Sequence, residues 1–263
     1  MAIETLESVE IGEDVEPETI VRWTLERFAG RRIVLTTSFG MEGCALVDMV
    51  ARHGQPIPVV YLDTMFLFPE THALRDRMAQ RYPHLRFENR GTQLTPREQE
   101  KRYGAELWRR NPDACCRIRK VEPMRQVLAE ADVWMTGLMR SQSAGRAGLR
   151  AVEWDTRHRV RKVNPLAGWD RARVWEYVRR HDVPYNELHE RGYPSIGCVQ
   201  CTAAVTGTGP ADYTRAGRWS GTSKNECGLH ETRESRNSSR EPAIPSAEIR
   251  DPRHATRDVR VGT

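Results

Sequence analysis

The chain has no long uninterrupted apolar stretch and few aromatic residues. Of its 263 residues, 38% are hydrophobic and 7% aromatic, and no run approaches the roughly 20 apolar residues that a membrane-spanning helix needs. The N-terminal sequence, MAIETLESVEIGEDVEPE, is acidic and lacks the basic start and apolar centre of a secretory signal. We therefore expect a cytoplasmic protein without a membrane partner.

Recognisable nucleic-acid-binding features are also missing. The formal net charge is +5 and the isoelectric point is about 9.0, which suits either nucleic acid or a small anionic substrate. The basic excess lies in three separate clusters, at 117–120, 157–162 and 215–218, without an aromatic-rich RNA-binding segment or a DNA-recognition motif. Each cluster alone also fits a solvated charged face. We expect the clusters to converge on a small anion and predict no nucleic-acid partner.

Internal repeats are absent, and the order of apolar runs favours one α/β domain. The pattern predicts strands at 32–37, 57–63, 85–89 and 132–137, and helices at 17–29, 41–53, 69–82, 119–130 and 171–181. Strands that alternate with helices indicate a parallel sheet covered on both faces, with ligands beyond the carboxyl ends of its strands. We expect residues 1–230 to form this domain. Residues 231–263 have few apolar side chains and predict a disordered or loosely packed tail.

Cysteine is scarce, but four of the six cysteines form two close pairs. Cys115 and Cys116 are adjacent, and Cys198 and Cys201 form a C-x-x-C pair. Adjacent cysteines rarely bond to each other, because the resulting ring is strained, and structural disulfides are rare in the cytosol. The two pairs together supply the four thiolates of an all-cysteine metal site. Their spacing favours a [4Fe–4S] cluster over zinc, which more usually takes C-x2–4-C on both sides. Buried free thiols are the alternative.

The two remaining cysteines differ in their surroundings. Cys44 lies on the apolar face of a predicted helix, so we expect a small core residue there. Cys227 lies in the polar stretch KNECGLHE, far from a second thiol. Nearby cations such as Lys224 and His230 lower the pKa of a thiol and make it a nucleophile. This segment alone fits a nucleophile and an inert tail cysteine equally well.

Three segments that follow predicted strands could bind an anionic nucleotide, namely TTSFGMEG, LDTMFLFPET and TGLMRSQSAGR. TTSFGMEG ends a strand and begins a helix, where backbone N–H groups near Ser38 and Gly40 favour an anion. The LDT of YLDT ends the next strand and could contact a nucleobase edge. Arginines suit phosphate and sulfate because their donors are bidentate. The candidate clamp residues are Lys120, Arg140, Arg146, Arg215 and Arg218, although each alone also suits a surface ion pair.

Taken together, these stretches resemble the assimilatory adenylyl-sulfate/phosphoadenylyl-sulfate reductases. The matching segments are TTSFGMEG, LDTMFLFPETH, CCRIRKVEP, TGLMRSQSAGR, KVNPLAGW, VPYNELHERGYPSIGCVQCT, RAGRW and ECGLH, in the family's order over about residues 30–230. The cysteine set resembles that of the iron–sulfur subclass, which mostly prefers adenylyl sulfate. The resemblance thus implies one [4Fe–4S] cluster per chain, held by Cys115, Cys116, Cys198 and Cys201.

The resemblance also implies a fold and a reaction. The fold is the adenine-nucleotide α-hydrolase-like fold, with a modified pyrophosphate loop at SFGMEG in which Phe39 replaces a glycine of the S-G-G-x-D-S loop of ATP-using relatives. The implied reaction is attack of Cys227 on the sulfur of adenylyl sulfate, with loss of AMP. Thioredoxin or a glutaredoxin-like dithiol then releases sulfite from the S-sulfocysteine. The nucleophile would lie in a C-terminal segment at about 205–230.

The same matches, with the clamp residues, imply which side chains surround the substrate. They are Ser38, Phe39, Gly40, Leu62, Asp63, Thr64, Lys120, Gly137, Arg140, Arg146, Arg215, Arg218 and His230. Because Lys120 is close in sequence to Cys116, it could also respond to the charge of the cluster. We hypothesise that the cluster has a structural and electrostatic role, because dithiol exchange can supply all the electrons.

Three positions depart from the family pattern, and other functions stay open. Met65 stands where the family usually has glycine, and Met139 and Ser141 interrupt its usual arginine loop. A phosphoadenylyl-sulfate reductase or a dual-substrate enzyme is the first alternative. An ATP-dependent enzyme of RNA thiolation would need the S-G-G-x-D-S loop, which is missing. A non-catalytic metal-binding module is the third alternative, and a homo-oligomer is possible.

Overall fold

The fold is built on a six-stranded sheet with the order β3-β2-β1-β4-β6-β5. The computed structural model describes residues 11–12, 15–205, 216–219, 224 and 226–230. The strands are β1 (Ile33–Thr36), β2 (Pro58–Tyr61), β3 (Arg86–Asn89), β4 (Val133–Thr136), β5 (Val152–Asp155) and β6 (Val160–Val163). Every neighbouring pair is parallel except β5 and β6, which are antiparallel.

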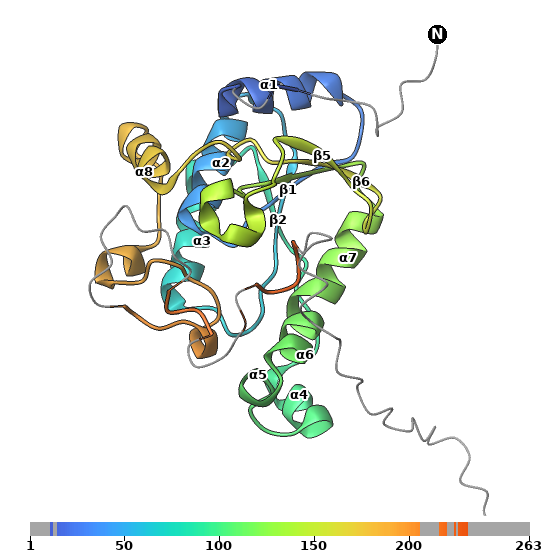
Figure 1. The fold of residues 1–263 in the computed structure, drawn as a ribbon, viewed down its shortest axis with the longest axis vertical. Coiled ribbons are helices and arrows are strands. Elements are labelled where there is room, and N and C mark those ends of the chain that lie inside the picture. The colour runs from blue at the N-terminus through green and yellow to red at the C-terminus, as the bar shows by residue number, and fades with distance from the viewer. Residues whose placement is uncertain (1–10, 13–14, 206–215, 220–223, 225, 231–263) are drawn as a thin grey trace, which may run out of the picture.

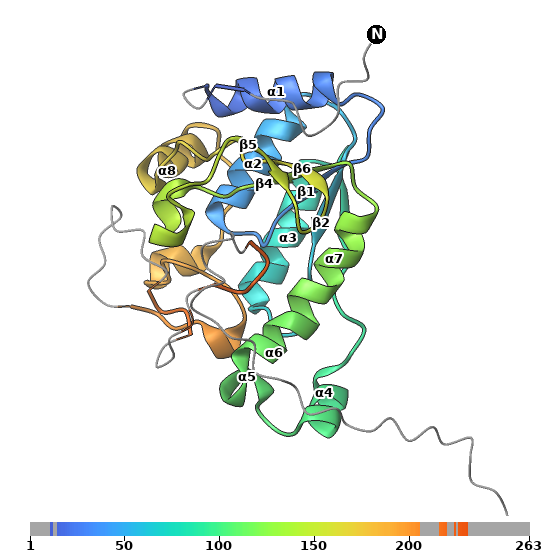
Figure 2. The same cartoon turned by 45° about the vertical axis from the view of Figure 1, so that its right-hand side comes forward.

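Helices cover both faces of this sheet, as Figures 1 and 2 show. The α-helices are α1 (Pro17–Arg27), α2 (Met41–Ala51), α3 (Pro69–Arg81), α4 (Pro96–Tyr103), α5 (Leu107–Arg110), α6 (Pro112–Cys116), α7 (Glu122–Ala129) and α8 (Arg171–Arg180). A π-helical turn, η1 (Arg117–Val121), joins α6 to α7. Short 3-10 helices follow at η2 (Arg140–Gln142), η3 (Ala144–Arg146), η4 (Glu187–Arg191) and η5 (Val199–Cys201).

Alternate residues of the central strands supply two separate apolar cores. Ile33 and Leu35 of β1 point toward α1, α2, α3 and α8 and belong to the larger core. Val34 of the same strand packs on the opposite face with Met124 and Leu128 of α7. This period of two is what a strand buried on both faces requires. The sheet therefore separates α7 from the other long helices.

The helix that carries Cys115 and Cys116 continues without interruption through a proline. Pro123 has no N–H group to bond the carbonyl of Arg119, four residues earlier. The chain adapts by a π-type turn, in which the N–H of Glu122 donates to the carbonyl of Arg117. Such turns are frequent at functional sites. Here the turn lies between the adjacent cysteines and α7.

The predicted strands and helices are confirmed, but the β5–β6 hairpin and the short helices α4 to α6 were not predicted. The four predicted strands and five predicted helices all form, with ends shifted by a few residues. Asp170 caps α8, since its carboxylate accepts from the N–H of Arg173 at 2.9 Å. The β5–β6 hairpin was not predicted, because two buried residues of β6, Arg161 and Lys162, are charged. Charged residues interrupt the apolar run that is typical of a buried strand. Lys162 pairs with Glu153 of β5 at 3.0 Å.

The strand order reverses between β1 and β4, which lie side by side in the middle of the sheet. The chain leaves β1 toward β2 and β3 on one side, and leaves β4 toward β6 and β5 on the other. The loops that follow β1 and β4 therefore diverge and open a crevice at the carboxyl ends of the strands. Within the described part of the chain, no helix is long and apolar enough to cross a membrane. The predicted tail at 231–263 lies outside the described residues.

Candidate active site

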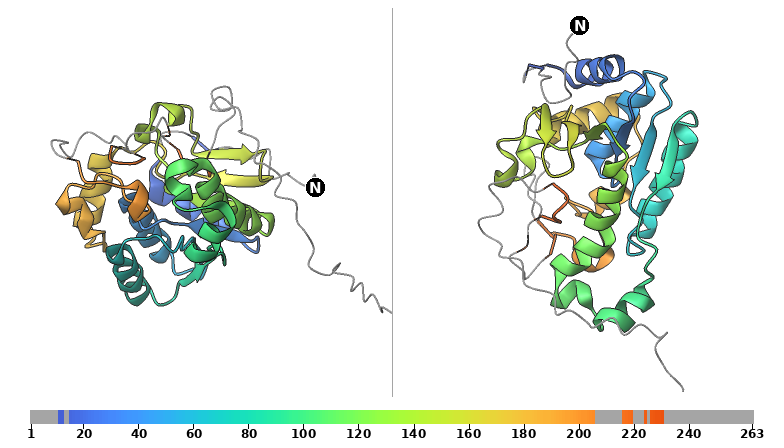
Figure 3. Two further views of the ribbon diagram at one scale, coloured as in Figure 1. Left: turned by 90° about the horizontal axis from the view of Figure 1, so that it is seen from below. Right: turned by 90° about the vertical axis from the view of Figure 1, so that its right-hand side faces the viewer.

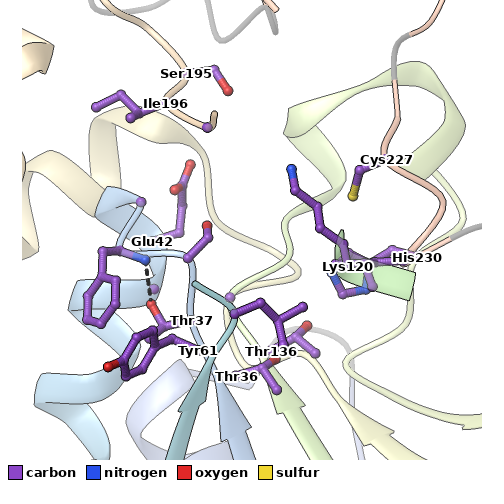
Figure 4. Close-up of a pocket in the computed structure, with 18 of the residues that line it drawn as sticks. Thr36, Thr37, Glu42, Tyr61, Lys120, Thr136, Ser195, Ile196, Cys227 and His230 are labelled. Atoms are coloured by element: carbon purple, nitrogen blue, oxygen red, sulfur yellow. Dashed lines mark hydrogen bonds between the residues drawn. The ribbon is translucent and has the colours of Figure 1, made fainter. Parts of the chain in front are cut away.

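A pocket occupies the crevice at the carboxyl ends of β1, β2 and β4. Its walls come from the loop after β1, the loop after β2, the helix η1, the loop after β4 and two C-terminal segments (Figure 4). Predicted site residues in the lining are Ser38, Phe39, Gly40, Leu62, Thr64, Lys120, Gly137, Arg146, Cys198, Arg218, Cys227 and His230. Segments more than a hundred residues apart in sequence thus meet at one place.

The loop after β1 makes a tight turn at Phe39. Phe39 has a positive φ of 57°, the conformation that a glycine would adopt, and its N–H donates to Oγ1 of Thr37 at 2.9 Å. Its ring leaves the pocket and packs on Tyr61 with a centroid distance of 5.4 Å. A Cβ at Gly43 would lie 2.4 Å from Oγ1 of Thr37. Only glycine therefore lets the first turn of α2 approach this loop.

Lys120 and Cys227 meet on one wall of the pocket. Figure 4 shows the sulfur of Cys227 beside the Lys120 side chain, and His230 lines the same pocket. Burial would lower the pKa of the Lys120 ammonium, but the negative charge of Cys198, Cys116 and Cys227 as thiolates outweighs burial and raises it. Lys120 is therefore a cation between the cysteine group and the candidate nucleophile.

The segment that carries Cys227 is fixed to the sheet on the α7 side. The ring of His230 stacks on Trp134 of β4 with a centroid distance of 5.0 Å and an interplanar angle of 20°. Leu229 packs in the core beneath α7, and Arg157 donates to the carbonyl of Gly228 at 3.1 Å. Figure 3 shows this red segment beside the green helix. These contacts place Cys227 over the strand ends.

Arg218 reaches the pocket across a glycine. Its guanidinium donates to the carbonyls of Cys201 and Ile196, each at 3.3 Å. A Cβ at Gly197 would lie 2.3 Å from Nη2 of Arg218. The glycine before the C-x-x-C pair therefore makes room for a cation at the pocket.

The four paired cysteines line one small cavity next to this pocket. The loop of the C-x-x-C pair docks on the loop after β2. Oγ1 of Thr64 lies 3.3 Å from Sγ of Cys198, and the N–H of Val199 donates to the carbonyl of Phe66 at 2.8 Å. Cys115 and Cys116 face the same cavity from α6. Helix and loop thus bring together thiols that are distant in sequence.

The thiols lie in a largely buried environment that includes a buried arginine. Burial, reinforced by the neighbouring thiols, raises the pKa of Cys115 to about 12 and that of Cys201 to about 11. Arg119 is 1% exposed and donates to Gln99 and to the carbonyl of Thr64, each at 2.8 Å. Among the described residues, no group of three or more His, Cys, Asp or Glu is arranged as a ready-made site for a metal ion.

Three predicted substrate-binding residues are not in the described pocket lining. The carboxylate of Asp63 instead accepts from the N–H of Met65 at 2.7 Å. Arg140 donates to the carbonyl of Leu149 at 2.8 Å. Arg215 lies outside the described residues. Cys44, by contrast, is confirmed as a core residue and is fully buried.

The pocket also contains polar residues that the sequence analysis missed. Glu42, Gln142 and His189 all line it. Glu42 and Gln142 lie in stretches that were already singled out, but their residue types suit a surface equally well. The Nδ1 of His189 lies 2.8 Å from the carbonyl of Tyr193, and burial lowers the pKa of this imidazole. Its Nε2 is buried and has no protein hydrogen-bond partner among the described residues.

Comparison with known proteins identifies the family. The phosphoadenosine phosphosulfate reductase domain matches residues 32–204. The chain belongs to this family. The adenosine 5'-phosphosulfate reductase of Shouchella clausii is 44% identical over 211 residues, which cover 80% of this chain and 86% of that protein. The phosphoadenosine 5'-phosphosulfate reductase of Gloeobacter violaceus is 44% identical over 221 residues, which cover 83% and 90%.

Solved structures confirm the predicted fold. The phosphoadenylyl-sulfate reductase of Candida auris, solved as a phosphate complex, has a TM-score of 0.63 and 28% identity, and the match covers 74% of this chain and all of that one. The FMN adenylyltransferase of Candida glabrata in complex with ATP has a TM-score of 0.51 at 14% identity, over 88% of this chain and 83% of that one. The second likeness concerns the fold alone. The reductase family therefore shares the adenine-nucleotide α-hydrolase-like architecture seen here.

Proposed function

We propose that this chain reduces adenylyl sulfate to sulfite and AMP for sulfate assimilation, with Cys227 as the nucleophile. The observation that carries the proposal is that Cys227 lines the same pocket as the loop after β1 and the cations Lys120 and Arg218. The names of several relatives, such as the protein of Shouchella clausii, support adenylyl sulfate as the substrate. The reaction would suit the cytoplasm, where thiols stay reduced.

The first step is transfer of the sulfonate group. The thiolate of Cys227 attacks the sulfur of adenylyl sulfate, and the bond between that sulfur and the phosphate oxygen breaks. AMP leaves with the bonding electron pair, and Cys227 becomes an S-sulfocysteine. Charge grows on the leaving and non-bridging oxygens, so fixed cations such as Lys120 and Arg218 stabilise the transition state.

The second step returns the enzyme to its starting state. A thiolate of thioredoxin or a glutaredoxin-like dithiol attacks Sγ of Cys227 and releases sulfite with the electron pair of the sulfur–sulfur bond. The second thiol of the donor then displaces Cys227 from the mixed disulfide. Two electrons pass from the dithiol to the sulfonate sulfur, so no other reductant is needed.

We also propose that Cys115, Cys116, Cys198 and Cys201 hold a [4Fe–4S] cluster. The fit is supported by four thiols that line one small cavity, the number of thiolate ligands that a [4Fe–4S] cluster requires. When bound, the cluster would supply structural support and local charge. Lys120, on the wall between this cavity and the pocket, would respond to that charge.

The metal content of native protein and a Cys198→Ser variant tests the cofactor. Anaerobically purified native protein should contain about four iron and four sulfide per chain, and the variant should lose most of both. Stoichiometric zinc in the native protein, or no metal, would contradict the cluster. The readout does not depend on activity.

Product formation tests the reaction and the substrate. With reduced thioredoxin, native protein should release sulfite and AMP from adenylyl sulfate, and Cys227→Ser should release neither. Phosphoadenylyl sulfate is the alternative substrate, supported by the names of the Gloeobacter violaceus and Candida auris proteins. A higher kcat/KM for phosphoadenylyl sulfate would reverse the substrate assignment and leave the mechanism in place.

A further inference from the structure

Glu226, the residue before Cys227, makes an ion pair with the pocket wall. Its Oε2 accepts from Nη2 of Arg146 at 2.9 Å, and its Oε1 accepts from Oγ of Ser143 at 3.5 Å. The Arg146 side chain is 8% exposed and that of Glu226 is 22% exposed. A partly buried, charge-assisted hydrogen bond is stronger than a surface ion pair. The pair is therefore a specific anchor for the segment that carries Cys227.

Arg146 is held in place by a chain of polar contacts that runs back to α2. Its Nη1 donates to Oε1 of Gln142, which also accepts from the N–H of Met139 at 3.2 Å. The amide nitrogen of Gln142 donates to Oε1 of Glu42 at 3.3 Å. Glu42 is 8% exposed. The guanidinium thus has a fixed position before it meets Glu226.

We propose that Glu226 is a positioning residue that latches the Cys227 segment over the pocket through Arg146. As a statement about catalysis, the proposal rests on the proposed role of Cys227 as nucleophile. Holding a nucleophile at its point of attack lowers the entropic part of the barrier. The latch must also release, because the S-sulfocysteine has to reach a dithiol on another protein. The ion pair lies at the edge of the pocket, where the Glu226 side chain is 22% exposed, so this contact can open reversibly.

The latch is tested by the alkylation rate of Cys227 in cluster-loaded protein without nucleotide or dithiol. Glu226→Gln keeps the shape of the side chain and removes its charge. Removing that charge also alters the pKa of the adjacent thiol, so the quantity compared is the maximal rate at high pH, where the thiol is fully ionised. Peptide mass spectrometry assigns the modification to Cys227.

Loss of the latch should raise this maximal rate about tenfold, the effect of losing one charge-assisted hydrogen bond. The matched control is Glu187→Gln, which removes a carboxylate paired with Arg77 and Arg191 at the surface and should leave the rate unchanged. Arg146→Gln should raise the rate as Glu226→Gln does. The double variant should react no faster than either single variant, because both remove the same contact.

A maximal rate in Glu226→Gln equal to that of native protein and of the control would overturn the latch. If the rate increases caused by Glu226→Gln and Arg146→Gln add up in the double variant, the two residues do not act through one shared contact, and the role of Arg146 in the latch would be overturned. Neither result depends on turnover. A failure of the proposed reductase function would therefore show in the product assay and not in the alkylation rate. In an active reductase, Glu226→Gln should also lower the rate of S-sulfonation at saturating adenylyl sulfate about tenfold.

Discussion

Two residues near the pocket adopt a backbone conformation that normally favours glycine, and they differ in what compensates for it. Phe39 and Met65 both have a φ of 57°. The Phe39 ring is buried against Tyr61 and Phe87, so apolar burial offsets the strain. Met65 is 41% exposed and gains little burial in return. Strain at Met65 is therefore a local cost to stability.

Replacing Met65 by glycine should stabilise the fold. The left-handed conformation costs an ordinary residue about 1 kcal/mol, and glycine adopts it without that cost. Urea unfolding should show a gain approaching this value for Met65→Gly. Met65→Ala keeps the strain and serves as the control. Equal stability of the two variants would contradict the strain.

Replacing Lys120 by alanine should separate the two roles proposed for this cation. The variant should lower kcat by about 10²–10³, the effect typical of one lost donor to the transition state. Iron content and cluster absorbance should stay at the native level, because Lys120 supplies none of the proposed ligands. Unchanged turnover would contradict a role in the reaction.

At the scale of elements, buried polar contacts help to decide how the helices pack. Such contacts are harder to predict from a sequence pattern than the helices themselves. Asp48 on α2 is 2% exposed and accepts from the hydroxyls of Tyr82 at 2.9 Å and Tyr177 at 2.6 Å. One carboxylate thus joins α2, the end of α3 and α8. The period of apolar residues predicted these helices but not the contact that unites them.

This network predicts that stability falls at alkaline pH. Burial and the Asp48 carboxylate raise the pKa of Tyr82 and Tyr177 above the usual 10.0. The folded state therefore keeps protons that the unfolded chain releases, so the stabilisation is complete below about pH 10 and is lost as pH rises further.

Tyr82→Phe removes one of these two groups. The decline of unfolding free energy above about pH 10 should become shallower by about 1.4 kcal/mol per pH unit. At neutral pH the variant should be less stable by about 1 kcal/mol, because one hydrogen bond is lost. Denaturant titrations across the pH range measure both. An unchanged alkaline slope would contradict the network.

Helices and strands were missed where charged or turn-forming residues interrupt the regular spacing of apolar residues. The sequence near α4 contains a capping box, in which Thr95 and Glu98 bond reciprocally, and its T-P-R-E pattern could have indicated a helix start. The buried Arg161 and Lys162 of β6 gave no comparable signal. Strands with apolar or β-branched runs, such as β1 and β4, were predicted correctly because burial on both faces requires such runs.

At the scale of the whole molecule, the candidate site exists only because four distant parts of the chain converge. The loop after β1, the helix η1, the C-x-x-C segment and the segment around Cys227 all line adjoining cavities. The resemblance of motifs predicted most members of this set. It could not predict the contact between Glu226 and Arg146 or the exclusion of Asp63 and Arg140 from the lining, because these depend on side-chain directions in the folded chain.

The central claim is that Cys227 accepts a sulfonate from adenylyl sulfate, and intact-protein mass spectrometry tests it most directly. Anaerobically purified protein, mixed with adenylyl sulfate in the absence of a dithiol, should gain the mass of one sulfonate at Cys227. Reduced thioredoxin should then remove that mass. Protein that retains its cluster but forms no adduct with adenylyl sulfate or phosphoadenylyl sulfate would contradict the proposed reaction.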